Sequence, residues 1–176
     1  MKSVLISIKP KWIEKIVNGE KTIEVRKTRP KIETPFKCYI YCTYGQENEN
    51  YMLGKRGKVI GEFICDKVYS IKNQGNSFVV ANEEQGVTNE IARQSCLDYD
   101  DMVGCLGNKD GYGLHITALK IYDKPKELGE FIKPCPYGDL PCSICPSCDK
   151  DKNDNLIQCF NTVSRPPQSW CYVEEL

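Results

Sequence analysis

Three charged residues within one short stretch of the sequence, Lys21, Glu24 and Arg26, could bind or transform a charged ligand. Glu24 and Arg26 are two positions apart, so on a β-strand their side chains share one face and can form an ion pair. Lys21 precedes them at a predicted helix-to-strand turn, near enough to add a third charge. A lysine beside other cations can lose its proton and act as a base or nucleophile, whereas a protonated lysine would help Arg26 to hold a phosphate. The plainest alternative is a surface ion pair worth less than about 1 kcal/mol.

A second group with chemical potential is a set of five cysteines in a polar stretch near the C-terminus. Its members are Cys135, Cys142, Cys145, Cys148 and Cys159. Two overlapping C-x-x-C pairs lie within it, and a C-x-x-C turn places two sulfurs where a tetrahedral zinc ion needs half of its ligands. The stretch has few core-forming residues, so a bound metal could supply the free energy of folding. We therefore expect a structural zinc, held by all of these cysteines except Cys148, which is the spare ligand or a substitute.

Other uses of these cysteines are less consistent with the sequence. Disulfides are disfavoured in the reducing cytosol, and the spacing does not match that of ferredoxin iron–sulfur clusters. A catalytic zinc usually has a histidine or carboxylate ligand, and the single histidine, His115, lies outside the cluster. We expect His115 to be a hydrogen-bonded structural residue within a strand.

The composition indicates a globular intracellular protein of one domain. The chain has 176 residues, of which 40% are hydrophobic, and its 24 lysines and arginines balance 24 acidic residues. This balance argues against a uniformly basic nucleic-acid-binding surface but allows a local patch. The N-terminus has no targeting signal, and no apolar run has the length of a membrane span. We expect a cytoplasmic location and no membrane partner.

The hydrophobic pattern predicts two main helices among several short strands. One helix begins at Pro10 and ends at Asn18–Gly19, and the other spans residues 88–106. Residues 45–58 are polar and are expected to form a loop. The expected strands are residues 4–8, 22–27, 37–44, 59–71, 113–122 and 170–173. This order favours an α+β fold with a small β-barrel over a parallel α/β sheet.

The stretch from Gly19 to Arg26 resembles the signature of the ASCH domain, a branch of the PUA-like β-barrels. That signature reads Gly-x-Lys-x-x-Glu-x-Arg, and the matching residues are Gly19, Lys21, Glu24 and Arg26. The stretches 7–11, 111–116 and 166–170 also resemble parts of bacterial and phage-borne members, so the resemblance covers most of the chain. It implies one PUA-like domain over residues 1–176, with a cysteine-rich insertion at residues 134–162.

The resemblance also implies a function, since ASCH domains are thought mainly to bind RNA. Our leading hypothesis is a module that binds RNA or a modified nucleotide in a basic cleft. The cleft residues would be Lys9, Lys21, Glu24, Arg26 and Lys27. Four tyrosines could stack on bases beside them or pack the barrel instead. These are Tyr39, Tyr41, Tyr44 and Tyr51.

Two alternatives remain open at the level of the sequence. Some small relatives are amidohydrolases that remove the acetyl group from acetylcytidine with a lysine, a threonine and a glutamate. By this resemblance Lys21 would be the reactive base, Glu24 would stand at the position of the threonine, and Glu62 or Glu83 would supply the carboxylate. The other alternative is a protein-interaction adaptor that uses the zinc insertion as its contact surface.

Overall fold

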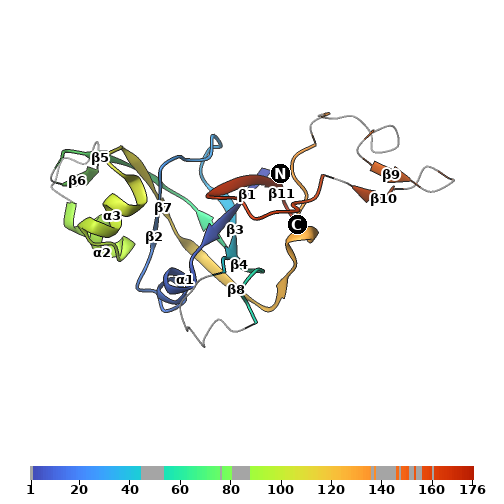
Figure 1. Ribbon diagram of the computed structural model, residues 1–176, viewed down its shortest axis with the longest axis horizontal. Coiled ribbons are helices and arrows are strands. Elements are labelled where there is room, and N and C mark those ends of the chain that lie inside the picture. Colours follow the sequence, from blue (N-terminus) through green and yellow to red (C-terminus); the bar gives the residue numbers. More distant parts are fainter. Residues whose placement is uncertain are drawn as a thin grey trace.

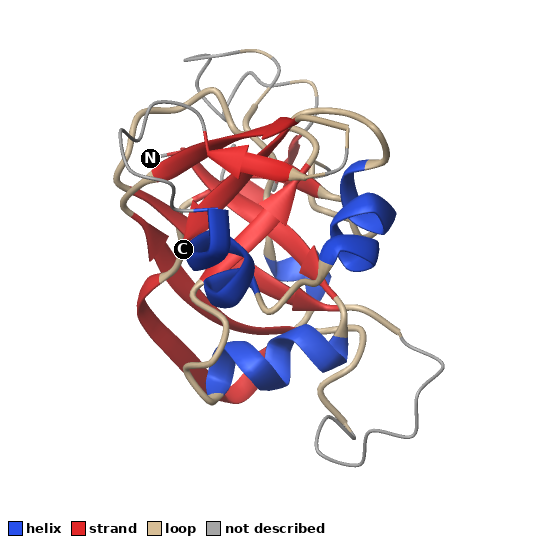
Figure 2. Ribbon diagram, turned by 90° about the vertical axis from the view of Figure 1, so that its left-hand side faces the viewer, coloured by secondary structure: helices blue, strands red, loops and turns tan. Residues whose placement is uncertain are grey.

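The computed structural model of the chain shows a mixed α+β fold of three sheets and three α-helices in the residues that it describes. These are residues 2–44, 54–75, 77–80, 88–135, 137, 146, 148–150, 153, 156–159 and 161–176. Figure 1 shows the helices α2 and α3 beside β5–β7 at one end of the molecule and the strands β9 and β10 at the other. Seen from the helical end, the strands form the centre and the helices lie around them (Figure 2). Within these ranges, no helix is both long and apolar enough to span a bilayer.

The largest sheet has five strands in the order β11-β1-β3-β4-β8. Its strands are β1 (Lys2–Ile8), β3 (Phe36–Cys42), β4 (Val59–Cys65), β8 (Thr117–Lys126) and β11 (Trp170–Glu174). Strands β1 and β3 are parallel, and the other neighbours are antiparallel. In β3 the residues 38, 40 and 42 pack in one apolar cluster, whereas Tyr39 and Tyr41 pack in another on the opposite face. This strand is therefore buried on both faces, which explains its nearly continuous apolar sequence.

The second sheet has four antiparallel strands in the order β2-β7-β5-β6. They are β2 (Ile23–Arg26), β7 (Gly111–His115), β5 (Val68–Asn73) and β6 (Phe78–Val80). The helices α2 (Thr88–Ser95) and α3 (Tyr99–Leu106) contribute Ile91 and Met102 to a shared apolar cluster with Ile23 and Ile71, and Leu97 joins it from the connection between the two helices. A short 3-10 helix spans Leu128–Glu130, and β9 (Cys148–Lys150) pairs with β10 (Leu156–Cys159) in a separate ribbon.

Two long strands predicted from the sequence are wrong as single strands, because each passes from one sheet to the other. The predicted strand 59–71 divides into β4 and β5 at Asp66–Lys67, and the predicted strand 113–122 divides into β7 and β8 at Ile116. The two bends lie side by side, since the His115 amide donates to the Lys67 carbonyl at 3.0 Å. The His115 Nδ1 also lies 2.7 Å from the Asp66 carboxylate, so the predicted hydrogen-bonded role of His115 is confirmed. We call this double bend the corner.

The predicted closed barrel is not found in the part of the chain that the structure describes. Its strands form open sheets, the larger ones bounded by β11 and β8 and by β2 and β6. The physical reason is the corner, where both long strands leave the first sheet before it can close.

The helices follow local signals, but the predicted helix 88–106 is wrong as a single element. Helix α1 (Pro10–Val17) has proline in its first turn and ends before Gly19, as predicted. Residues 88–106 instead form α2 and α3, because Cys96 adopts a left-handed φ of 52°. Asp98 then caps α3 by accepting a hydrogen bond from the Asp101 amide at 2.7 Å.

The tight pairing of β4 with β8 leads to a test of the fold. Gly61→Ala would place its Cβ against the backbone oxygen of Lys120, so we expect a loss of about 1–3 kcal/mol in the free energy of unfolding. Gly104→Ala in α3 meets open space and should stabilise the protein by about 0.5–1 kcal/mol. Chemical unfolding of both variants gives the comparison, and equal stability of the two would contradict the pairing.

Candidate nucleic-acid interface

The residues of the Gly-x-Lys-x-x-Glu-x-Arg stretch form a chain of buried ion pairs. The Glu24 carboxylate lies between the two cations, 3.4 Å from Lys21 Nζ and 2.8 Å from Arg26 Nη2. Only 2% of Lys21 and 6% of Glu24 are exposed, so the pairs are far better shielded than a surface salt bridge. One carboxylate compensates two cations, which leaves the group with one positive charge in excess.

Lys21 connects this ion-pair chain to the end of helix α2. Its ammonium donates a hydrogen bond of 2.6 Å to the Ser95 carbonyl, and the neighbouring Thr22 amide donates to the Gln94 carbonyl at 2.8 Å. Carbonyls at a helix C-terminus lack partners within the helix and favour a nearby cation. Lys21 therefore holds α2 against β2.

Arg26 connects the same ion-pair chain to the other sheet. Its Nη2 donates a hydrogen bond of 2.5 Å to the Ser7 carbonyl at the end of β1. Its buried Nε has no hydrogen-bond partner among the described residues. Arg26 thus bridges the two sheets and retains one donor that is not used by the fold.

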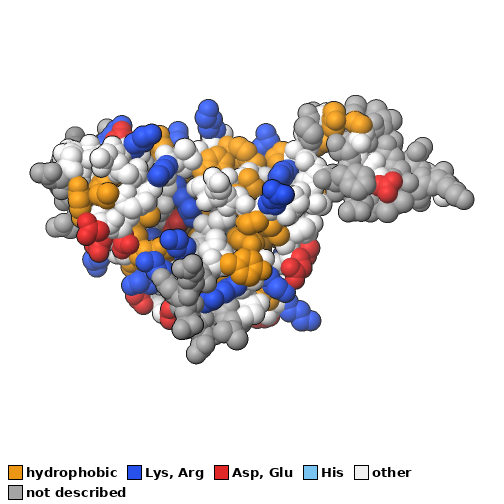
Figure 3. All heavy atoms as spheres, viewed as in Figure 1, with side chains coloured by type: hydrophobic (Ala, Val, Ile, Leu, Met, Phe, Trp, Pro, Cys, Tyr) orange, Lys and Arg blue, Asp and Glu red, His pale blue; other side chains and the backbone are white. Residues whose placement is uncertain are grey.

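A cleft of about 440 Å³ opens beside Glu24 and Arg26, between the two large sheets. Lys9, Trp12, Tyr41, Tyr44, Cys105 and residues 166–168 complete most of its wall. Lysine and arginine side chains gather over β2 and α1 on the face shown in Figure 3. The cleft therefore combines cationic groups with aromatic rings.

The structure brings together only some of the predicted site residues. Lys9, Glu24 and Arg26 line the cleft, whereas Lys21 lies behind Glu24 and does not reach its wall. Lys27 is exposed but is not among the lining residues. The sequence thus identified the stretch, but it did not reveal which of its charges faces the cleft.

The predicted tyrosines also separate in the structure. Tyr41 and Tyr44 line the cleft. Tyr39 packs in the core 4.9 Å from the ring of Phe131, and its hydroxyl accepts a hydrogen bond from the Leu176 amide. Tyr51 lies outside the described residues.

The glutamates considered for hydrolysis lie elsewhere. Glu62 accepts a hydrogen bond of 2.6 Å from the Tyr122 hydroxyl and is not part of the cleft wall. Glu83 lies outside the described residues.

Sequence reasoning missed several cleft residues. Trp12 lies on the predicted N-terminal helix but is not among the predicted site residues, yet its half-buried ring lines the cleft. Residues 166–168 lie in one of the stretches that resemble ASCH members, and this was the available signal for them. Burial raises the pKa of the Cys105 thiol and of the Tyr41 hydroxyl, so both favour the protonated form near neutral pH.

Comparisons with known proteins rest on the three-dimensional structure. No protein-family model matches the sequence, and no curated protein matches it. Crystal structures of ASCH from Zymomonas mobilis are similar in fold. A point mutant of that protein has a TM-score of 0.59 at 15% identity, over 99% of this chain and 92% of the mutant chain. The protein described simply as ASCH has the same TM-score and identity over 98% and 88%. The chain has an ASCH-type fold.

The predicted zinc ligands of this ASCH-type chain lie mostly beyond the described residues. Cys142 and Cys145 are outside them, as is the side chain of Cys159. Among the described residues no group of three histidine, cysteine or acidic side chains could hold a metal ion. The backbone does pair Cys148 directly with Cys159 across β9 and β10.

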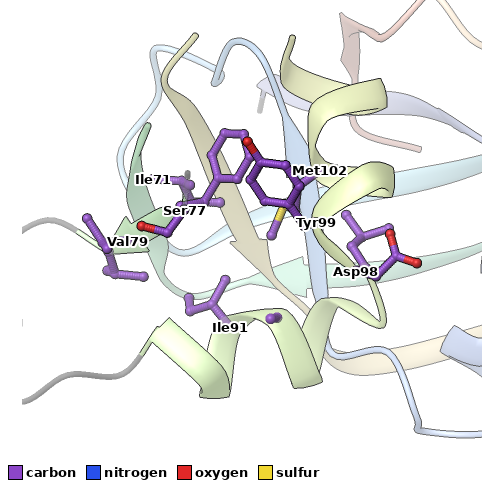
Figure 4. Close-up of a pocket in the computed structure, with 11 residues that line it drawn as sticks. Ile71, Ser77, Val79, Ile91, Asp98, Tyr99 and Met102 are labelled. Atoms are coloured by element: carbon purple, nitrogen blue, oxygen red, sulfur yellow. The ribbon is translucent and has the colours of Figure 1, made fainter. Parts of the chain in front are cut away.

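A separate apolar pocket lies at the helical end of the ASCH-type fold, between β5, β6, α2 and α3 (Figure 4). It has a volume of about 230 Å³, and Ile71, Ile91 and Met102 contribute to its wall. Tyr99 lies over it, with its hydroxyl donating a hydrogen bond of 2.8 Å to the Gly75 carbonyl. Most of its lining residues also belong to the core of the second sheet, so the pocket is a gap in that core rather than part of the charged cleft.

The central position of Glu24 predicts an order of stabilities. Glu24→Gln leaves the buried Lys21 and the mostly buried Arg26 without a counter-charge, so we expect a loss of about 3–5 kcal/mol in the free energy of unfolding. Lys21→Met keeps the pair of Glu24 with Arg26 and should destabilise the fold less. Urea unfolding of both variants measures the difference.

A matched control for this test is Lys72→Met, which breaks the exposed pair with Asp110. It should change the stability little, because solvent screens that pair. If Glu24→Gln were as mild as this control, the buried ion-pair chain would not hold the elements together.

Proposed function

We propose that this chain binds single-stranded RNA in the cleft beside Glu24 and Arg26. The observation that carries the proposal is the positive charge in excess on the buried ion-pair chain, at a wall that also presents aromatic rings. A surplus cation favours an anionic ligand, and exposed rings favour unstacked bases. Single-stranded RNA offers both features, and the ASCH-type fold is consistent with this ligand.

The phosphate contacts in this proposal come from Lys9 and Arg26. Lys9 is exposed at the rim of the cleft, where its ammonium can approach a phosphate without a large change in hydration. Arg26 is held by Glu24 and by the Ser7 carbonyl, so it loses little conformational entropy on binding. One cation is therefore adaptable and the other is preorganised.

The base contacts in this proposal come from Trp12 and Tyr44. Tyr44 lines the cleft and is 78% exposed, which leaves its ring available for stacking. Trp12 is half-buried, and Lys11 Nζ lies 4.5 Å from the centre of its ring. Stacking on such rings accepts any base, so the proposal includes no sequence preference.

Hydrolysis of acetylcytidine receives less support from the geometry. A general base must come within hydrogen-bond reach of its substrate, directly or through one water. Lys21 is buried behind Glu24 and donates to the Ser95 carbonyl, so its ammonium is already engaged by the fold. Acetate release from acetylcytidine that disappears in Lys21→Ala would nevertheless replace the binding proposal with the enzymatic one.

Titration of a labelled single-stranded RNA by fluorescence anisotropy tests the proposal. Tyr44→Ala should weaken binding by about 5- to 150-fold, because loss of one stacked base corresponds to roughly 1–3 kcal/mol. Lys9→Glu should weaken binding and reduce the magnitude of the salt slope by about 0.7 for the lost phosphate contact.

Two exposed residues away from the cleft give matched controls, namely Tyr137→Ala and Lys124→Glu. Both should bind RNA as the wild-type protein does. Absence of saturable RNA binding by the wild-type protein would refute the proposal, and equal effects of the control and cleft variants would place the site elsewhere.

We further propose that the cysteine-rich insertion holds a structural zinc ion in the reducing cytoplasm. Residues directly opposite each other on antiparallel strands have Cβ atoms about 4.5–5.5 Å apart, which suits two ligands of one ion. Cys148 and Cys159 are such a pair, so their register favours Cys148 as a ligand rather than as the spare cysteine. Cys145 then completes a C-x-x-C pair with Cys148.

Metal analysis of the purified chain tests the zinc proposal. The wild-type protein should contain about one zinc per chain, and Cys148→Ser or Cys159→Ser should lose it. Cys171→Ser in β11 is the control and should keep the metal. A mass two units lower than expected, with no metal, would instead indicate a disulfide between Cys148 and Cys159. Whether the insertion also contacts another protein stays a prediction.

A further inference from the structure

A second cavity with a positive lining lies beyond the cleft, next to the loop that connects β2 and β3. It has a volume of about 630 Å³ and shares no lining residue with the cleft. Arg29, Lys31 and Lys67 contribute three positive charges to its wall, and Glu33 contributes one negative charge. We call this cavity the basic pocket. No aromatic side chain is among its described lining residues, so its chemistry suits a negatively charged backbone rather than a base.

The basic pocket is built on a loop that contacts with β11 hold in place. The indole Nε1 of Trp170 donates to the Thr28 carbonyl at 3.2 Å, and the Tyr172 hydroxyl accepts a hydrogen bond of 2.6 Å from the Lys31 amide. These bonds fix the backbone from which two of the three cations extend. A fixed backbone lowers the entropy lost when the cations bind an anion.

Aromatic rings restrict two of the three cations. The Arg29 guanidinium lies 5.8 Å from the centre of the Tyr112 ring, and Lys67 Nζ lies 4.5 Å from the centre of the Tyr69 ring. Such cation–π contacts restrict a side chain without neutralising its charge.

The basic pocket and the cleft are joined by one short segment of chain. Arg26 lies at the cleft wall and Arg29 lies at the pocket wall, three residues away and so within roughly 11 Å along the backbone. The segment 166–168, which lines the cleft, continues into β11, whose Trp170 and Tyr172 hold the loop of the basic pocket. The two cavities are therefore neighbours along the chain, at a separation that one RNA strand can span.

We infer that the basic pocket binds the phosphate backbone of the same RNA strand whose neighbouring bases occupy the cleft. This inference rests on the proposed function and extends it by assigning the direction in which the strand continues. It predicts contacts that are independent of sequence and sensitive to salt, because the contact is made by charges. It also predicts that a longer RNA gains affinity from the basic pocket whereas a short one does not.

The test compares a triple variant, Arg29→Gln with Lys31→Gln and Lys67→Gln, with the wild-type chain. All three residues are exposed, so the fold should be retained. RNAs of about four and about twelve nucleotides are titrated between roughly 50 and 200 mM salt. For the longer RNA, the slope of log affinity against log salt should be smaller in magnitude by about two in the triple variant than in the wild-type chain. The triple variant should therefore lose roughly twenty-fold less affinity than the wild-type chain when the salt is raised over this range. The short RNA should bind both proteins alike.

A control variant carries the same change of net charge at exposed lysines that line neither cavity, namely Lys109→Gln, Lys120→Gln and Lys124→Gln. It should keep the wild-type slope. A triple variant with the wild-type slope would overturn the inference and leave the proposed function standing, whereas a wild-type chain that binds neither RNA would overturn both. Binding of inorganic phosphate that depends on the three cations, without any effect on the longer RNA, would identify a free-phosphate site and overturn the strand path.

Discussion

The rest of the structure depends on one carboxylate held between two cations. Glu24 compensates Lys21 on one side and Arg26 on the other in a region that is almost closed to solvent. Through Lys21 it reaches the end of α2, and through Arg26 it reaches the backbone of β1. Buried ion pairs contribute little to net stability when compared with apolar packing, but the loss of one partner is strongly unfavourable. The arrangement thus specifies where a helix and two sheets meet, and it leaves a cation at the wall of the cleft.

The sequence predicted the elements that are determined locally. Proline in the first turn and the Asn18–Gly19 end define α1, and the alternation of Glu24 and Arg26 defines β2. The two long strands were predicted without their bends because β-branched and apolar residues occur on both sides of Asp66 and of Ile116. Both bends depend on partners far away in the sequence, such as the Thr117 hydroxyl that donates to the Ile64 carbonyl at 2.9 Å. A non-local contact of this kind leaves no periodic signal, so the predicted barrel closure also failed.

In the candidate site, as in the fold, the sequence predicted the local arrangement but not the features that depend on distant contacts. The spacing of the signature stretch correctly places two charges on one face of a strand, but it carries no information about depth, and depth separates Lys21 from Arg26. The sequence could not show which tyrosines of β3 pack in the core and which line the cleft. Both faces of this central strand are buried, so alternation no longer distinguishes core from surface. Trp12 serves the core and the cleft together, so its apolar pattern revealed only the first role.

The corner has a mechanical consequence for the cleft. One wall of the cleft comes from β1 and β3 and the facing wall comes from β2, so its width depends on the angle between the two large sheets. The two sheets are connected at the corner, where β4 turns into β5 and β7 turns into β8 and where His115 and Asp66 form a hydrogen bond. At the cleft itself, the hydrogen bond from Arg26 to the Ser7 carbonyl joins the same two sheets. The contacts that join the two sheets beside the cleft therefore include one made by Arg26, the same side chain to which the proposed function assigns a phosphate contact.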